Sequence, residues 1–120
     1  MEVMQIKKII NDNELAKDKS FTFFEEVKEH GLFCKEIMVS STISKRNDIV
    51  FYYENVLLKN TDIRIRGDEI VVEVEDKFSF FISDKATNYR YITDDTEDGT
   101  ILNILYTLEE KIKIFISILF

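Results

Sequence analysis

The chain has 120 residues, of which 45% are hydrophobic and 32% charged, and its formal net charge is −7. This length and composition predict one globular domain with an ordinary core, and they exclude a disordered or low-complexity protein. The acidic balance disfavours nucleic acid and anionic membrane as direct partners, because an acidic surface repels phosphate.

The beginning of the chain carries no secretion signal that we can identify. Charged and polar residues interrupt the apolar ones over residues 1–10, so the hydrophobic region of a signal peptide is missing. No apolar run approaches the length of a membrane span. The single cysteine, Cys34, cannot form an internal disulfide and suits a reducing compartment. These features predict a cytoplasmic protein.

Two helices are predicted near the start of the chain. Apolar residues recur at helical spacing over residues 3–10, with polar residues on the opposite face. A second helix is expected over roughly residues 22–30, because Thr22 and Glu25 fit a capping box. Gly31 follows it at the position where a left-handed C-cap is expected.

From Leu32 the period of the apolar residues changes to two, which is typical of strands. Gly67–Asp68 and Asp76–Lys77 are predicted as tight turns, and 84–88 as a third turn. Connections this short leave no room for crossover helices, so neighbouring strands must be antiparallel. We expect a meander of about five or six strands, with 49–53 central and one sheet face covered by helices. The expected strands are 33–43, 49–53, 63–66, 70–75, 78–82 and 89–92.

The last twenty residues fit two patterns. Ile101, Leu105, Leu108, Ile112 and Phe115 follow the helical spacing and predict a helix of about five turns packed on one sheet face. Residues 111–118 also alternate with period two and are rich in isoleucine, which favours a strand. The helix is preferred because no turn residue interrupts the segment. The predicted fold class is therefore α+β, with N-terminal helices, an antiparallel meander sheet and a C-terminal helix.

Motifs for metal or covalent chemistry fail on inspection. Asp94, Asp98 and Gly99 match the first half of a calcium loop, but Leu105 stands where a bidentate glutamate is required. His30 and Cys34 lack the surroundings of a catalytic pair, and one His with one Cys is too few ligands for zinc. No glycine-rich phosphate loop occurs. We predict no enzyme activity and no cofactor.

Two acidic groups are the candidate partner-binding sites. Both are expected at sheet ends or turns, where acids commonly serve only to hold a solvated rim. The sharper interpretation is a docking surface for a basic protein, because complementary charge raises encounter rates and selects partners. The predicted partner-binding residues are Asp94, Asp95, Glu97 and Asp98 in one group, and Glu73, Glu75 and Asp76 in the other.

These observations favour a non-enzymatic protein-binding inhibitor. A bacterial immunity protein that neutralises a basic toxin, such as a nuclease, would need a rigid acidic face and no catalytic apparatus, and so would a phage inhibitor of host defence. One alternative is a structural subunit that forms a homodimer through its apolar C-terminal segment or an edge strand. Another is a small-ligand-binding domain whose pocket is lined by Tyr52, Tyr89 or Tyr91 with an inward carboxylate.

Overall fold

The computed structural model describes residues 16–43, 46–74 and 78–120, so the predicted helix over 3–10 and the predicted turn Asp76–Lys77 lie outside the described residues. The elements in chain order are helix α2 (Ala16–His30), strands β1 (Leu32–Ile43) and β2 (Arg46–Leu58), the 3-10 turn η1 (Asn60–Asp62), and strands β3 (Ile63–Arg66), β4 (Glu69–Val74), β5 (Phe78–Ser83), β6 (Thr87–Thr96), β7 (Gly99–Leu108) and β8 (Ile112–Leu119).

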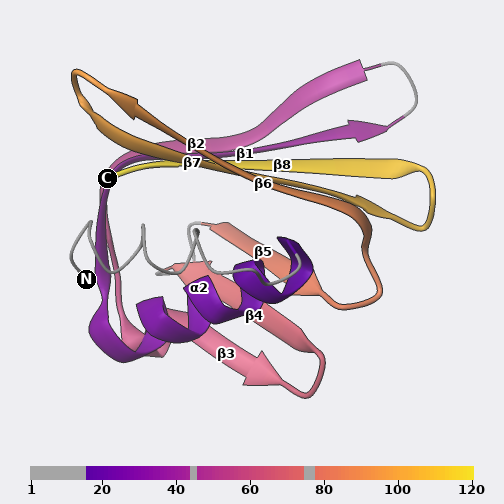
Figure 1. Cartoon of the computed structure of the whole chain (residues 1–120), viewed down its shortest axis with the longest axis horizontal. Coiled ribbons are helices and arrows are strands. Elements are labelled where there is room, and N and C mark those ends of the chain that lie inside the picture. Colours follow the sequence, from indigo (N-terminus) through magenta and orange to yellow (C-terminus); the bar gives the residue numbers. More distant parts are fainter. Residues whose placement is uncertain (1–15, 44–45, 75–77) are drawn as a thin grey trace.

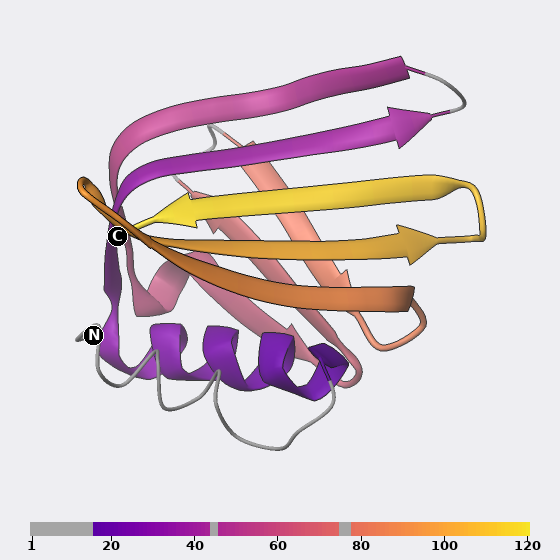
Figure 2. The same ribbon diagram turned by 45° about the horizontal axis from the view of Figure 1, so that its top comes forward.

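The strands form two antiparallel sheets in two layers. The first sheet has five strands in the order β2-β1-β8-β7-β6, and the second has three in the order β3-β4-β5. Figures 1 and 2 show the five-stranded sheet as one layer, with the three-stranded sheet and α2 side by side beneath it. The five-stranded sheet therefore has an inner face, which these elements cover, and an outer face on the opposite side.

The core lies between the two layers. Alternate residues of the central strands point inward, so that Ile37, Ile118 and Leu102 occupy neighbouring positions on β1, β8 and β7, and all three are fully buried. Aromatic rings join the layers, because Phe80 of the small sheet stacks on Phe51 with 6.1 Å between ring centroids. Burial of this apolar surface is the main favourable term in folding.

Helix α2 begins six residues before the predicted start and ends as predicted. Thr22 and Glu25 lie inside it, so they do not form the capping box that the sequence suggested. Gly31 has a φ of 75° and its N–H donates to the Val27 carbonyl at 2.8 Å, which confirms the left-handed C-cap. The inward side of the helix carries Phe23, whose ring meets Tyr91 of β6 edge-to-face at 6.4 Å.

The hairpin signals at Gly67–Asp68 are confirmed. Gly67 has a φ of 58°, and Arg66 pairs with Glu69 across a two-residue turn.

The prediction that residues 49–53 form a central strand is wrong, because β2 is an edge of the five-stranded sheet. Phe51 and Tyr53 of this strand are partly buried and pack against the core from one face of the sheet.

The predicted C-terminal helix is also wrong, because Gly99–Leu108 and Ile112–Leu119 form a hairpin of two strands. Its turn contains Glu109 and Glu110, with φ values of 52° and 60°, and the Lys111 N–H donates to the Leu108 carbonyl at 3.1 Å. Hairpin turns with two positive φ values usually contain Asn or Gly. Two glutamates gave no such signal, and the apolar residues on both faces of β7 also fit a helical period.

The fold class is accordingly corrected from helix-rich α+β to mostly β. In the described part of the chain, α2 is the one α-helix, and eight strands divide between two sheets instead of forming a single meander. The strand β8, placed at the end of the sequence, lies in the middle of the larger sheet between β1 and β7. The expectation that one sheet face is covered holds, although the cover is a second sheet together with a helix.

Candidate functional site

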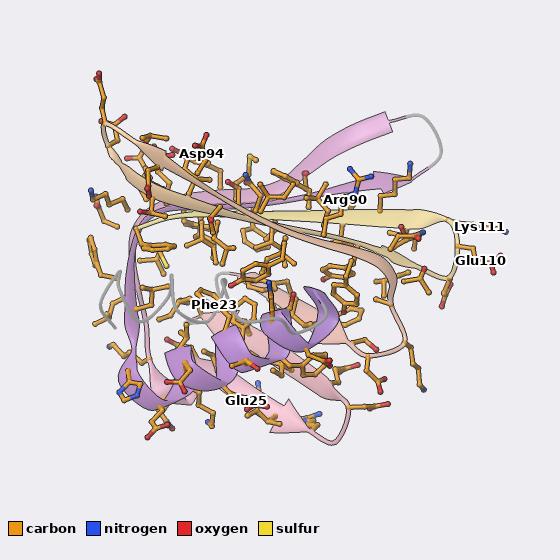
Figure 3. The ribbon with its side chains drawn as sticks, in the orientation of Figure 1. Phe23, Glu25, Arg90, Asp94, Glu110 and Lys111 are labelled. Atoms are coloured by element: carbon orange, nitrogen blue, oxygen red, sulfur yellow. The ribbon has the colours of Figure 1, made fainter. Side chains whose placement is uncertain are left out.

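The outer face of the five-stranded sheet has no described element packed over it, and the strand register arranges its side chains in rows. Figure 3 shows Asp94 and Arg90 projecting from this face, near opposite ends of β6. The two residues are four positions apart, which corresponds to about 13 Å along a strand. The face therefore carries negative charge at one end and positive charge at the other.

The row at the negative end crosses all five strands. Glu54 pairs with Glu36, Glu36 with Leu119, Leu119 with Ile101, and Ile101 with Asp94. The three acids are exposed and the two apolar residues between them are partly exposed. We call this set the acidic row, and it consists of Glu54, Glu36, Leu119, Ile101 and Asp94.

Two acids of the acidic row stand directly opposite each other. Glu36 and Glu54 are a cross-strand pair, and like charges in this position destabilise a sheet. The Tyr52 hydroxyl, two residues before Glu54, donates to its Oε1 at 3.1 Å. Desolvation, with hydrogen bonds to Glu36 and Glu54, raises the pKa of Tyr52 to about 12. The free protein therefore holds concentrated negative charge here, which a cation from a partner would neutralise.

Exposed apolar and aromatic side chains lie in the row next to the acidic row. Ile92, two residues before Asp94 on β6, is 48% exposed, and Tyr52, two residues before Glu54 on β2, is 46% exposed. Most protein interfaces combine an apolar centre with a charged rim, with aromatic residues enriched at the centre. The outer face supplies both parts on a rigid sheet.

The first predicted acidic group shares Asp94 with the acidic row, and its other members lie beyond the end of that row. Asp94, Asp95, Glu97 and Asp98 are all exposed at the β6–β7 hairpin, which replaces the helix start that the sequence suggested. The Asp95 Oδ1 accepts from the Thr100 hydroxyl at 2.9 Å, and the Asp98 carbonyl accepts from the Lys35 ammonium group. These contacts hold the hairpin in place and leave the Asp94 carboxylate within the acidic row.

The second predicted acidic group lies on the other sheet. Glu73 of β4 forms an ion pair with Arg64 of β3 at 2.6 Å, so its charge is already balanced on the surface of the three-stranded sheet. Glu75 and Asp76 lie outside the described residues. The structure thus does not bring Glu73 together with the Asp94 group.

Sequence reasoning missed Glu36 and Glu54. Alternation placed Glu36 on one face of its strand, but no local signal showed that Glu54 would face it across the β1–β2 pair. The β1–β2 register also contains a shift between Val39 and Ser40, which moves later pairs by one residue. The meeting of the two acids is a product of register and not of any motif.

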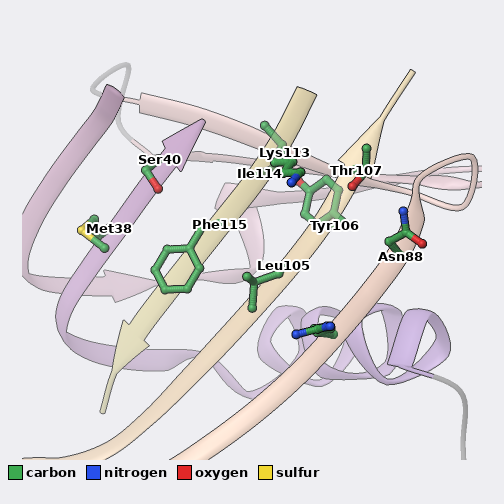
Figure 4. Close-up of a pocket in the computed structure, with 10 residues that line it drawn as sticks. Met38, Ser40, Asn88, Leu105, Tyr106, Thr107, Lys113, Ile114 and Phe115 are labelled. Atoms are coloured by element: carbon green, nitrogen blue, oxygen red, sulfur yellow. The ribbon is translucent and has the colours of Figure 1, made fainter. Parts of the chain in front are cut away.

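The positive end of the outer face is hollowed. Arg90, Leu105 and Phe115 follow one another across β6, β7 and β8, and Lys113 lies in the next row on β8. They line a hollow of about 700 Å³ that also touches Met38 of β1 (Figure 4). We call this feature the basic hollow.

Tyr52, Tyr89 and Tyr91 are the residues that would favour a small-ligand-binding domain if they lined a deep pocket, and the described structure gives them other surroundings. The Tyr89 hydroxyl donates to the Ser83 carbonyl, and Tyr91 packs against Phe23 in the core. Tyr52 lies at the acidic row. None of the three lines the basic hollow.

Nucleophilic and metal chemistry gain no support from the geometry. Cys34 is fully buried, and burial raises the pKa of its thiol to about 12, so it stays protonated at neutral pH. His30 is exposed at the end of α2, and its Nε2 lies 3.3 Å from the Oε2 of Glu26. Ligand atoms of Glu26, Glu29 and His30 lie within 4.8 Å of one another, but these are surface groups on one helix turn and nothing else points to a metal there.

Comparison with known proteins does not identify a family or a function. No protein-family model, curated protein or solved structure matches this chain. Within the described residues, no helix combines the length and apolar character needed to cross a membrane. The outer face of the five-stranded sheet is therefore the candidate functional site.

Proposed function

We propose that this chain is a non-enzymatic protein-binding inhibitor that docks a basic partner on the outer face of its five-stranded sheet. The observation that carries the proposal is the acidic row, in which Glu36, Glu54 and Asp94 stand exposed with the partly exposed Leu119 and Ile101 between them. The partner class is a basic toxin or defence effector, such as a nuclease, and the setting is the bacterial cytoplasm, whether a bacterium or its phage encodes the chain.

The electrostatics support a basic partner over a neutral one. Holding Glu36 opposite Glu54 costs stability in the free chain, and a lysine or arginine placed between them would relieve that repulsion. The exposed Asp95, Glu97 and Asp98 extend the same charge around the hairpin. Such a surface would steer a basic protein toward the acidic row and speed its association.

The alternative of self-association through the C-terminal segment has less support. Strand β8 is hydrogen-bonded to β1 on one side and β7 on the other, so its backbone is used within the sheet. Only an edge strand such as β2 could extend the sheet into a second copy.

The proposal is tested by co-expressing the chain with the product of the adjacent gene and purifying the complex. Changing Glu36, Glu54 and Asp94 together to Lys should raise the Kd roughly a hundredfold and remove protection from toxicity. A matched triple variant with Glu25, Glu29 and Asp68 changed to Lys alters the net charge equally and should bind normally. Equal effects of the two triples would show that only net charge matters and would contradict the proposal.

A further inference from the structure

The basic hollow concentrates positive charge on a chain whose net charge is −7. Arg90 is exposed on edge strand β6, and Lys113 is exposed on β8, two strands away and in the neighbouring row. Among the described residues that line the hollow there is no Asp or Glu. The local charge is therefore opposite to that of the chain as a whole.

The two cations are available to a ligand. In the described part of the chain, neither Arg90 nor Lys113 has an ion pair or a hydrogen bond to another side chain. Other basic residues are engaged, since Arg64 pairs with Glu73 at 2.6 Å and the Lys28 ammonium donates to the Ile63 carbonyl at 2.7 Å. Arg90 can form two parallel hydrogen bonds to one anionic group, and Lys113 adds a point charge.

The surface between the cations is apolar. Phe115 and Leu105 are cross-strand neighbours and both are partly exposed, and Met38 of β1 borders them on the next row (Figure 4). A phenyl ring and a flexible thioether can accommodate a flat or chain-like apolar body. Ser40, Asn88 and Thr107 add neutral hydrogen-bonding groups around it.

Size and charge distribution select the kind of anion. A volume of about 700 Å³ lies within the range of small-molecule sites. An extended polyanion would continue along the strands toward the acidic row about 13 Å away, where Glu36 and Asp94 would repel it. A compact molecule with one anionic group avoids that repulsion.

We propose that the basic hollow binds a small organic anion, with its anionic group hydrogen-bonded to Arg90, with Lys113 attracting it as a second positive charge, and with its apolar body on Phe115, Leu105 and Met38. This site is distinct from the acidic row, and the proposal does not depend on the protein-binding function.

The experiment compares two fluorescent probes that differ by one group. The anionic probe is 8-anilinonaphthalene-1-sulfonate, and the neutral probe is N-phenyl-1-naphthylamine, which has the same rings without the sulfonate. The anionic probe should bind with one-to-one stoichiometry and at least roughly tenfold more tightly than the neutral probe. Arg90→Gln and Lys113→Gln should each weaken the anionic probe by roughly tenfold and leave the neutral probe unchanged.

The matched control is the double variant Arg66→Gln/Lys85→Gln, which removes two exposed cations near the three-stranded sheet and should bind both probes like the unmodified chain. Phe115→Ala should weaken both probes together, and its near-ultraviolet circular dichroism checks that the fold is kept. The proposal is overturned if the anionic probe does not bind, if the two probes bind equally, or if Arg90→Gln and Lys113→Gln both bind the anionic probe like the control.

Discussion

The two faces of the five-stranded sheet are built from the same strands but serve different purposes. On the inner face, neighbouring strands contribute Ile37, Ile118 and Leu102, and all three are fully buried. On the outer face, the residues next to these in the sequence are charged, polar or partly exposed. The exposed acids lie at one end of this face and the exposed bases at the other. The inner face therefore carries the stability of the fold, and the outer face is free to carry recognition.

The largest expected effect comes from removing the strand that both faces share. Deletion of residues 112–120 should abolish folding, because β8 is central and its loss splits the five-stranded sheet into the separate pairs β2–β1 and β7–β6. It also removes the fully buried Ile116 and Ile118, each worth roughly 2–5 kcal/mol, which together approach the stability of a domain. Circular dichroism and analytical ultracentrifugation would check this, and a truncated chain that stays folded and monomeric would contradict it.

Adjacent residues on β7 provide a paired test of the two faces. Ile104 is fully buried on the inner face, and Leu105 is partly exposed on the outer face. Ile104→Ala should lower the free energy of unfolding by roughly 2–5 kcal/mol, whereas Leu105→Ala should lower it by about 1 kcal/mol or less. Urea denaturation measures both. Equal losses would show that the outer face is also part of the core.

Alkaline pH should weaken the core through the Cys34 thiol, which is fully buried there. Its pKa is about 12 in the folded chain and 9.0 for a solvent-exposed cysteine, so the unfolded chain loses this proton first. Stability from this group is therefore complete below pH 9 and is lost between pH 9 and pH 12, by up to about 4 kcal/mol. The free energies of unfolding of the unmodified chain and Cys34→Ala should converge by that amount. Parallel curves across this pH window would show that the thiol is not held protonated by burial.

The smallest expected effect lies on the outer face. Glu54→Gln removes the like-charge pair with Glu36 and keeps an acceptor for the Tyr52 hydroxyl. It should raise the free energy of unfolding by roughly 0.5 kcal/mol or less. Glu110→Gln, at an exposed position in the β7–β8 turn, is the control and should change little. A clear loss of stability in Glu54→Gln would mean that the carboxylate pair supports the fold instead of straining it.

The two hairpins on either side of the molecule explain which parts of the fold the sequence could predict. The β3–β4 hairpin was predicted because Gly67 permits the positive φ that its turn requires. The β7–β8 hairpin was missed because Glu109 and Glu110 take positive φ values without any residue that favours them. Tertiary pairing of β8 between β1 and β7 evidently outweighs this local cost.

The same distinction applies to the candidate site, where residues close in sequence could be grouped and residues far apart in sequence could not. The acids around Asp94 were recognised as a group because they are neighbours in the sequence. Glu36 and Glu54 are 18 positions apart in the sequence, and Arg90 and Lys113 are 23 apart, so only strand register brings each pair onto one end of the outer face. Sequence alternation can place a residue on a face, but it does not determine which residue on another strand will stand beside it.

The most direct test of the proposed interface is to record which backbone amides respond when a purified basic partner, identified by its co-purification with the chain, is added to the isotope-labelled chain. The account predicts that the nuclear magnetic resonance signals of Tyr52, Ile101 and the three acids of the acidic row shift or broaden. The Glu36/Glu54/Asp94→Lys variant should show none of these changes. Changes confined to α2 or the three-stranded sheet, with the acidic row unaffected, would contradict the account.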